Sequence, residues 1–178
     1  ALADGGLAQT GDDSVDLQSE QALAKKAQAE VEKARLEIMK RQQQLLGSQR
    51  EGSGAGLAAQ ELELSQDKHR LALQKAATAD FRLTRAKAQS MAAEQRLEML
   101  ALSEEAKKSS PGSPERGHLE KKLAELEKRI ATLESEAATA RQMTQAGEAK
   151  IAELTTQLES KWGSRFTGKK PTVRVFQS

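Results

Sequence analysis

The feature that most constrains the fold is a seven-residue repeat of apolar side chains between residues 113 and 162. Counted with Leu123 at position a, the large apolar residues at the a and d positions of this stretch are Leu119, Leu123, Leu126, Ile130, Leu133, Ile151, Leu154 and Leu158, and the last d position is Lys161. A repeat held in one register over roughly six heptads is typical of a helix that packs lengthwise against another helix. The stretch therefore predicts a coiled-coil seam.

Local signals agree with a single helix over residues 115–162. Ser113 and Pro114 offer an N-cap and a first helical residue, while Gly163 offers a stop. Acidic residues at e and basic residues at g provide complementary charge along the seam. The middle of the seam is weaker and allows two interpretations, either a close approach of the neighbouring helix or a flexible point; its a and d residues are Ala137, Ala140, Thr144 and Gly147.

Composition favours long helices over a compact fold. The chain of 178 residues has 37% hydrophobic, 30% charged and only 2% aromatic residues. An ordinary domain of this length would use more aromatic side chains in its core. We therefore expect an all-α protein, with long helices forming an antiparallel coiled coil or an elongated three-helix bundle, followed by a short extended C-terminal tail.

Glycine and proline clusters divide the chain into seven segments. The expected order is a flexible acidic arm at 1–13, a helix at 14–46, a Gly/Ser linker at 47–56, a helix at 57–107, a Ser/Pro turn at 108–114, the coiled-coil helix at 115–162 and a basic extended tail at 163–178.

The first two expected helices carry broader apolar patterns than the third. In the first, a heptad stripe is widened by residues that lie partly off it, which indicates contact with more than one neighbouring helix; these are Leu23, Leu36, Met39 and Leu46. The second has mixed stripes and twelve alanines, a pattern typical of a helix sandwiched between others.

We find no residue pattern that predicts catalysis or a bound cofactor. The two histidines, His69 and His118, lack metal-ligand spacing, and the chain has no cysteine to supply a thiolate ligand. The glycines at 52–56 have neither a preceding strand nor the Lys-Ser/Thr of a phosphate-binding loop. We expect no enzyme activity, no metal, no cofactor and no small-molecule substrate.

The end of the chain is the strongest candidate for a functional surface. Here basic side chains alternate with three of the four aromatic residues, a combination that protein interfaces favour. The candidate partner-binding residues are Trp162, Arg165, Phe166, Lys169, Lys170, Arg174 and Phe176. Three interpretations stay open: contact with a partner protein, a cap on the end of the bundle, or binding to a polyanion.

These observations predict a structural or scaffold protein that assembles with itself or a partner through helical seams and docks through its C-terminal tail. The alternative is a peripheral binding module whose tail targets an anionic membrane surface or nucleic acid. A formal net charge of +2 points to neither a strong polycation nor a polyanion. The compartment stays open between cytoplasmic and exported, with Ala1-Leu2-Ala3 as a weak sign of a processed N-terminus.

Overall fold

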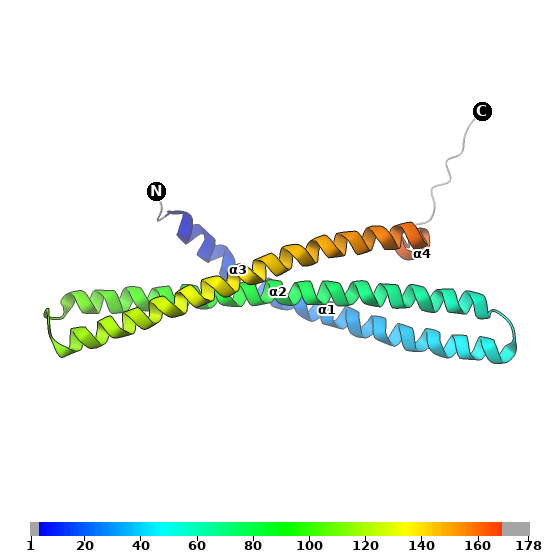
Figure 1. The fold of residues 1–178 in the computed structure, drawn as a ribbon, viewed down its shortest axis with the longest axis horizontal. Coiled ribbons are helices and arrows are strands. Elements are labelled where there is room, and N and C mark those ends of the chain that lie inside the picture. Colours follow the sequence, from blue (N-terminus) through cyan, green and yellow to red (C-terminus); the bar gives the residue numbers. More distant parts are fainter. Residues whose placement is uncertain (1–3, 169–178) are drawn as a thin grey trace, which may run out of the picture. The chain divides into compact units, whose positions relative to one another are not determined.

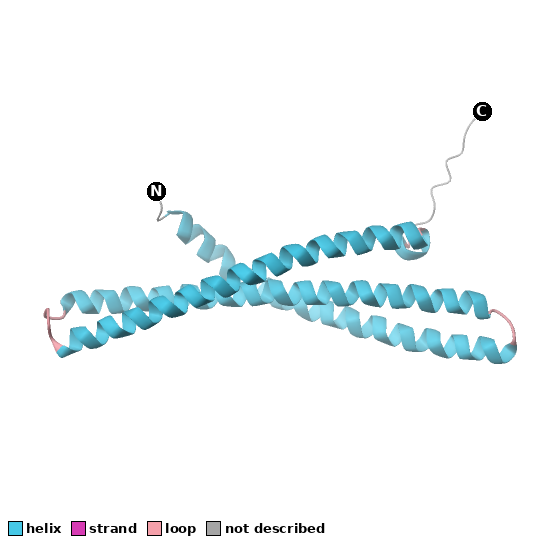
Figure 2. Ribbon diagram, viewed as in Figure 1, coloured by secondary structure: helices cyan, strands magenta, loops and turns pink. Residues whose placement is uncertain are grey.

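The computed structural model describes residues 4–168, with side chains described for residues 17–168. Its elements are α1 (Asp4–Glu51), α2 (Ala55–Lys108), α3 (Pro114–Trp162) and the short α4 (Ser164–Thr167) (Figure 1). Within this range there is no strand (Figure 2). The fold is an all-α helical bundle, as the repeat and the composition predict.

The described chain divides into two units, and each long helix contributes to both. Unit 1 comprises residues 4–25 and 79–145, and unit 2 comprises residues 26–78 and 146–168. Each unit therefore packs one segment each of α1, α2 and α3.

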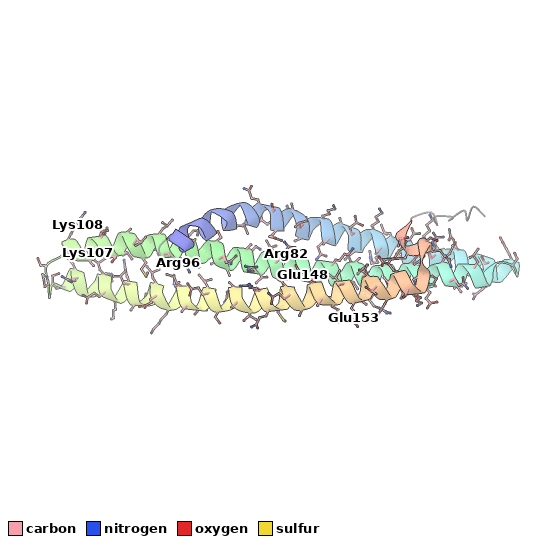
Figure 3. The ribbon with its side chains drawn as sticks, turned by 90° about the horizontal axis from the view of Figure 1, so that it is seen from above. Arg82, Arg96, Lys107, Lys108, Glu148 and Glu153 are labelled. Carbon is pink, nitrogen blue, oxygen red and sulfur yellow. The ribbon has the colours of Figure 1, made fainter. Side chains whose placement is uncertain are left out.

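Unit 1 is built around the hairpin of α2 and α3, which lie side by side next to the turn at residues 109–113 (Figure 1). Arg96 on α2 pairs with Glu134 on α3. Helix α2 is also joined to α1, by the ion pair of Arg82 and Glu20 at 3.0 Å. The last turn of α2 carries Lys107 and Lys108, which project from its end (Figure 3) and complement the negative end of the helix dipole.

Unit 2 is built around the hairpin of α1 and α2. The chain reverses through residues 52–54, where Gly52 and Gly54 have φ values of 74° and 75° that side chains rarely adopt. Arg41 on α1 and Glu61 on α2 then pair at 2.7 Å. Segment 146–162 of α3 runs antiparallel to α2, because Gly147 lies against Thr78 and Trp162 bonds to Asp67.

The first helix is longer at both ends than the sequence predicts. It begins at Asp4, inside the segment expected to be a flexible arm, and it continues past Gly47 to Glu51. Adding residues to an existing helix is much easier than starting a new one. A glycine such as Gly47 inside the helix costs only about 1 kcal/mol, which is too little to end the helix by itself. The stop lies at Gly52, whose N–H donates to the Ser48 carbonyl at 3.0 Å.

The other helix bounds lie within two residues of the expected ones. The second helix starts at Ala55 rather than Leu57 and ends at Lys108 rather than Lys107. The third begins at Pro114, and the Ser113 Oγ accepts a hydrogen bond from the Arg116 N–H at 3.2 Å. Ser113 is thus the N-cap that the sequence indicates.

The start of the expected extended tail is helical instead. Gly163 ends α3 with a φ of 55°, yet its carbonyl accepts from the N–H groups of Phe166 and Thr167 at 3.1 and 3.2 Å. These local bonds close the single turn of α4, which ends at Gly168. The strand-like stretch at 172–177 lies outside the described residues.

Alanine dominates the interior, while many large apolar side chains lie outside. Among the side chains described, eight of the twelve buried apolar residues are alanines. The other four are Leu71, Leu126, Ile130 and Leu158. The exposed large apolar residues are Leu23, Leu36, Met39, Leu46, Leu57, Leu73, Met91, Leu97, Leu100 and Met143. Small interior residues let the helices of each unit pack closely.

Candidate functional site

The seam of α3 faces inward along its length. Leu126, Ile130 and Leu158 are buried, and the remaining residues of the predicted seam are half-buried: Leu119, Leu123, Leu133, Ile151 and Leu154. The weaker middle of the seam is also buried, with Ala137 and Ala140 in unit 1. The predicted face of α3 is therefore occupied by packing within the chain.

Gly147 marks a close approach of two helices in unit 2. A Cβ atom on Gly147 would lie 2.3 Å from the Thr78 Oγ1 and 3.1 Å from the Thr78 Cβ. Real Cβ contacts at 2.3 Å do not occur, so this position requires glycine for α2 and α3 to pack as they do. Of the two interpretations of the weak middle, close approach accounts for Gly147.

At the end of α3 the inward face shifts by one residue. The heptad places Lys161 at d, but Lys161 is exposed and Trp162 is half-buried in its place. Trp162 follows the buried Leu158 by four residues, which keeps both side chains on one face of the helix. The indole therefore continues the seam and meets α2.

The contact with α2 is a polar group of side chains centred on Trp162. The indole Nε1 donates to the Asp67 Oδ2 at 3.0 Å, and the Lys161 Nζ donates to the same oxygen at 3.0 Å. Lys161 also donates to the Glu63 Oε1 at 2.7 Å. We call this group the Trp162 cluster; its members are Gln60, Glu63, Asp67, Lys161, Trp162 and Arg165.

Two cations lie near the indole ring of the Trp162 cluster. The Lys161 Nζ lies 5.2 Å from the ring centroid and the Arg165 Cζ lies 5.3 Å from it. Both distances are within the range of a cation–π contact. Arg165 also donates from Nη1 to the Gln60 Oε1 at 3.3 Å, which ties the start of α4 to α2.

The electrostatics of the cluster depend on the Asp67 carboxylate, whose side chain is only 9% exposed. Burial raises the pKa of the Asp67 carboxyl, but hydrogen bonds from Trp162 and Lys161 and the charges of Lys161 and Arg70 together lower it below its ordinary value. The hydrogen bonds to Glu63 and Asp67 raise the pKa of Lys161. The cluster is therefore charged at neutral pH and holds the two helices together.

The α2 members of the cluster were not predicted from the sequence. Gln60, Glu63 and Asp67 follow one another at three and four residues, so they share one face of α2 and present a row of acceptors. That spacing is the signal by which they were detectable. Their partner is not readable from α2 alone, because it depends on where α3 ends.

The described part of the predicted partner-binding set packs against its own chain. Trp162 and Phe166 are half-buried, and the exposed Arg165 bonds to Gln60. Trp162 and Arg165 therefore contact α2 of their own chain. The other members of the set lie outside the described residues: Lys169, Lys170, Arg174 and Phe176.

The described residues include neither a group arranged as a metal site nor a helix that could span a membrane. His69 on α2 is half-buried, and His118 on α3 is exposed. Across the side chains described, no group of three His, Cys, Asp or Glu residues is arranged to hold a metal ion. None of the described helices is long and apolar enough to cross a membrane.

Comparison with known proteins adds no relative. No protein-family model, no curated protein and no solved structure matches this chain.

Proposed function

We propose that this chain is a structural coiled-coil protein, a scaffold that assembles with itself or with a partner rather than an enzyme. The observation that carries the proposal is the exposure of ten large apolar residues on a bundle whose interior is mostly alanine. Single exposed leucines are normal on a protein surface, but exposed apolar residues that share one face of a helix mark an interaction surface.

The energetics favour association of such a surface. Burying a leucine or methionine side chain fully contributes roughly 1.5–3 kcal/mol. Within the bundle the exposed residues gain only part of this, and the remainder becomes available in contact with a second protein. Burial of the interior alanines contributes little free energy by comparison. Much of the apolar area of this chain therefore stabilises it only through contacts beyond the described helices.

Docking through the C-terminal tail is the second part of the proposal. Among the described basic residues at the C-terminal end of the chain, Lys161 already bonds to Glu63 and Asp67 on α2. An anionic membrane or a nucleic acid would have to bind mainly through Lys169, Lys170 and Arg174. We therefore favour a protein partner for the tail over the alternative of a polyanion.

Sedimentation of two chains tests the proposal. The intact chain is expected to associate as its concentration rises, and a chain that ends at Trp162 is expected to lose binding to a partner protein. An intact chain that stays monomeric over a wide concentration range would contradict self-assembly. Binding of the intact chain to anionic vesicles or DNA that weakens with added salt would favour the polyanion alternative.

A further inference from the structure

The exposed apolar residues of α1 in unit 2 form one continuous stripe. Leu36, Met39 and Leu46 are 54%, 48% and 56% exposed. With the exposed Gln43 they recur at three- and four-residue intervals, so their side chains share one face of the helix. Glu32 and Arg50 continue the same spacing at the two ends. We call this set the outer stripe; in chain order it is Glu32, Leu36, Met39, Gln43, Leu46 and Arg50.

The outer stripe is separate from the face by which α1 packs in its own unit. That inner face also follows a heptad spacing, and its residues are half-buried: Val31, Ala34, Ile38, Arg41 and Leu45. Arg41 on this face pairs with Glu61 on α2. Helix α1 therefore carries two seams, of which one is occupied within the unit and the other is exposed.

The order of residues in the outer stripe is self-complementary when the stripe is read in opposite directions. In an antiparallel pair of identical stripes centred on position 41, Leu36 lies level with Leu46 and Met39 lies level with Gln43. At each end Glu32 lies level with Arg50. The two Met39–Gln43 contacts thus lie at the centre with a Leu36–Leu46 contact on each side of them, and opposite charges meet at both ends.

The flanking positions are compatible with the same pairing. A two-fold axis makes each edge of the stripe face the same edge of the second copy, so Lys40 lies near the second copy's Lys40, and Lys33 lies near its Gly47 and Glu51. Both copies of Lys40 are exposed, and their long side chains turn away from one another into solvent. A parallel pair would instead bring Glu32 against Glu32 and Arg50 against Arg50, which is unfavourable. Charge therefore selects the antiparallel orientation.

We propose that the outer stripe binds the outer stripe of a second copy of this chain, antiparallel and about a two-fold axis. This inference rests on the proposed self-assembly and specifies its surface. Glu32 bonds to Arg35 in the single chain, with both side chains more than half exposed. Exposed pairs of this kind are screened by solvent and contribute little, so exchange of Arg35 for Arg50 of the second copy costs little.

The size of the stripe sets the strength of the dimer. From Glu32 to Arg50 the helix rises by about 27 Å, and a helix is about 10 Å wide. A pair of such faces buries less than the roughly 1,000 Å² expected of a tight specific interface. The dimer is therefore a weak one, and it forms at high protein concentration or where many copies are held together.

A matched pair of variants tests the surface. Met39→Glu places a charge in the middle of the stripe twice per dimer, so its dissociation constant in sedimentation is expected to rise by at least about tenfold. Leu73→Glu is the control, because Leu73 is 47% exposed, lies in the same unit and is outside the stripe. Circular dichroism checks that both variants keep the helical content of the original chain.

Charge reversal tests the orientation. Glu32→Arg and Arg50→Glu each place like charges at both ends of the antiparallel dimer, so each is expected to weaken it several-fold. The double variant restores opposite charges at both ends and is expected to recover the original dissociation constant. Failure of the double variant to recover affinity would overturn the antiparallel pairing of Glu32 with Arg50.

Cross-linking gives a second measure of register, since the chain has no cysteine of its own. A mixture of Leu36→Cys and Leu46→Cys chains is expected to form a disulfide between the two variants. Either variant alone should not cross-link, because its two cysteines lie about 15 Å apart along the axis, beyond the reach of a disulfide. Cross-linking of Leu36→Cys alone would contradict the proposed register.

The outcomes separate this inference from the proposed function. If the original chain associates and Met39→Glu associates equally well, the outer stripe is not the surface, while self-assembly stands. If the original chain shows no association at any concentration, both the stripe and self-assembly fail.

Discussion

At the residue scale, the close approach of α2 and α3 in unit 2 makes a specific prediction for Gly147. An alanine usually stabilises a helix interior by about 1 kcal/mol relative to glycine. Here the added Cβ would collide with the β-branched Thr78, whose side chain has little freedom to move away. We expect Gly147→Ala to destabilise the chain by about 1–3 kcal/mol in urea unfolding.

The matched control for Gly147 is Gly117 on the same helix. Nothing lies within 4 Å of the Cβ that would be added at Gly117. Gly117→Ala is therefore expected to be neutral or stabilising by up to about 1 kcal/mol. If Gly147→Ala and Gly117→Ala changed stability equally, the close approach of Gly147 to Thr78 would be disproved.

Asp67 provides a prediction about pH. The pKa of its carboxyl is lower in the folded chain than the ordinary value of 3.8, so the unfolded chain takes up the proton first as the pH falls. The stabilisation by the charged Asp67 is therefore complete above about pH 4 and is lost as the pH falls through the lower folded pKa. We expect Asp67→Asn to lower stability by about 1–2 kcal/mol at neutral pH, since a buried charged acceptor is lost.

The measurement for Asp67 is urea unfolding from pH 7 to pH 2. The difference between the original chain and Asp67→Asn should stay constant down to about pH 4 and then shrink. Glu63→Gln is the control, since Glu63 is 53% exposed and its pair with Lys161 is screened by solvent and should contribute little to stability. A difference that did not change with pH would show that the charge of Asp67 is irrelevant to the Trp162 cluster.

At the scale of the element, the start of α3 depends on Ser113. Its Oγ accepts from the Arg116 N–H, which would otherwise have no partner within the helix. We expect Ser113→Ala to cost about 1 kcal/mol in thermal or urea unfolding. Ser110→Ala, in the same turn, is the control and is expected to change stability by less than about 0.5 kcal/mol, because Ser110 is exposed. Equal effects of the two substitutions would contradict the role of Ser113 as a cap.

The elements also show which parts of the fold are readable from sequence. The inward face of α3 was predictable because helix periodicity decides which residues share a face, whatever the neighbour is. The start at Ser113 was predictable because cap and proline signals act locally. Gly47 was wrong as a stop, because glycine permits the left-handed conformation without requiring it. The chain takes that conformation at Gly52 instead.

The Trp162 cluster shows why contacts between elements were harder to foresee. The heptad placed Lys161 on the seam, yet the helix turns Trp162 inward at its end. Trp162 faces inward there because its indole bonds to Asp67 on α2. Asp67 lies opposite Trp162 because of where the chain turns between α2 and α3 and of the register in which these helices pack. The sequence identified the aromatic and basic residues as special, but it did not reveal that the described ones bind their own chain.

At the scale of the whole molecule, the distribution of apolar residues limits how much stability the folded single chain can gain. The interior of alanines buries little area per residue, and hydrophobic stabilisation scales with the area buried. Leucine and methionine on the outside add stability only when another surface covers them. Stability and self-assembly of this chain are therefore expected to be coupled.

This coupling predicts that the midpoint of thermal unfolding rises with protein concentration. Association of folded chains stabilises them by mass action, by about 0.7 kcal/mol per chain for each tenfold increase above the dissociation constant of a dimer. For a chain of this length the midpoint should rise by about 1–3 °C per tenfold. Differential scanning calorimetry over a hundredfold range of concentration measures this slope. Met39→Glu should abolish it and Leu73→Glu should retain it; a flat midpoint for the original chain would mean that the exposed apolar residues do not hold folded copies together.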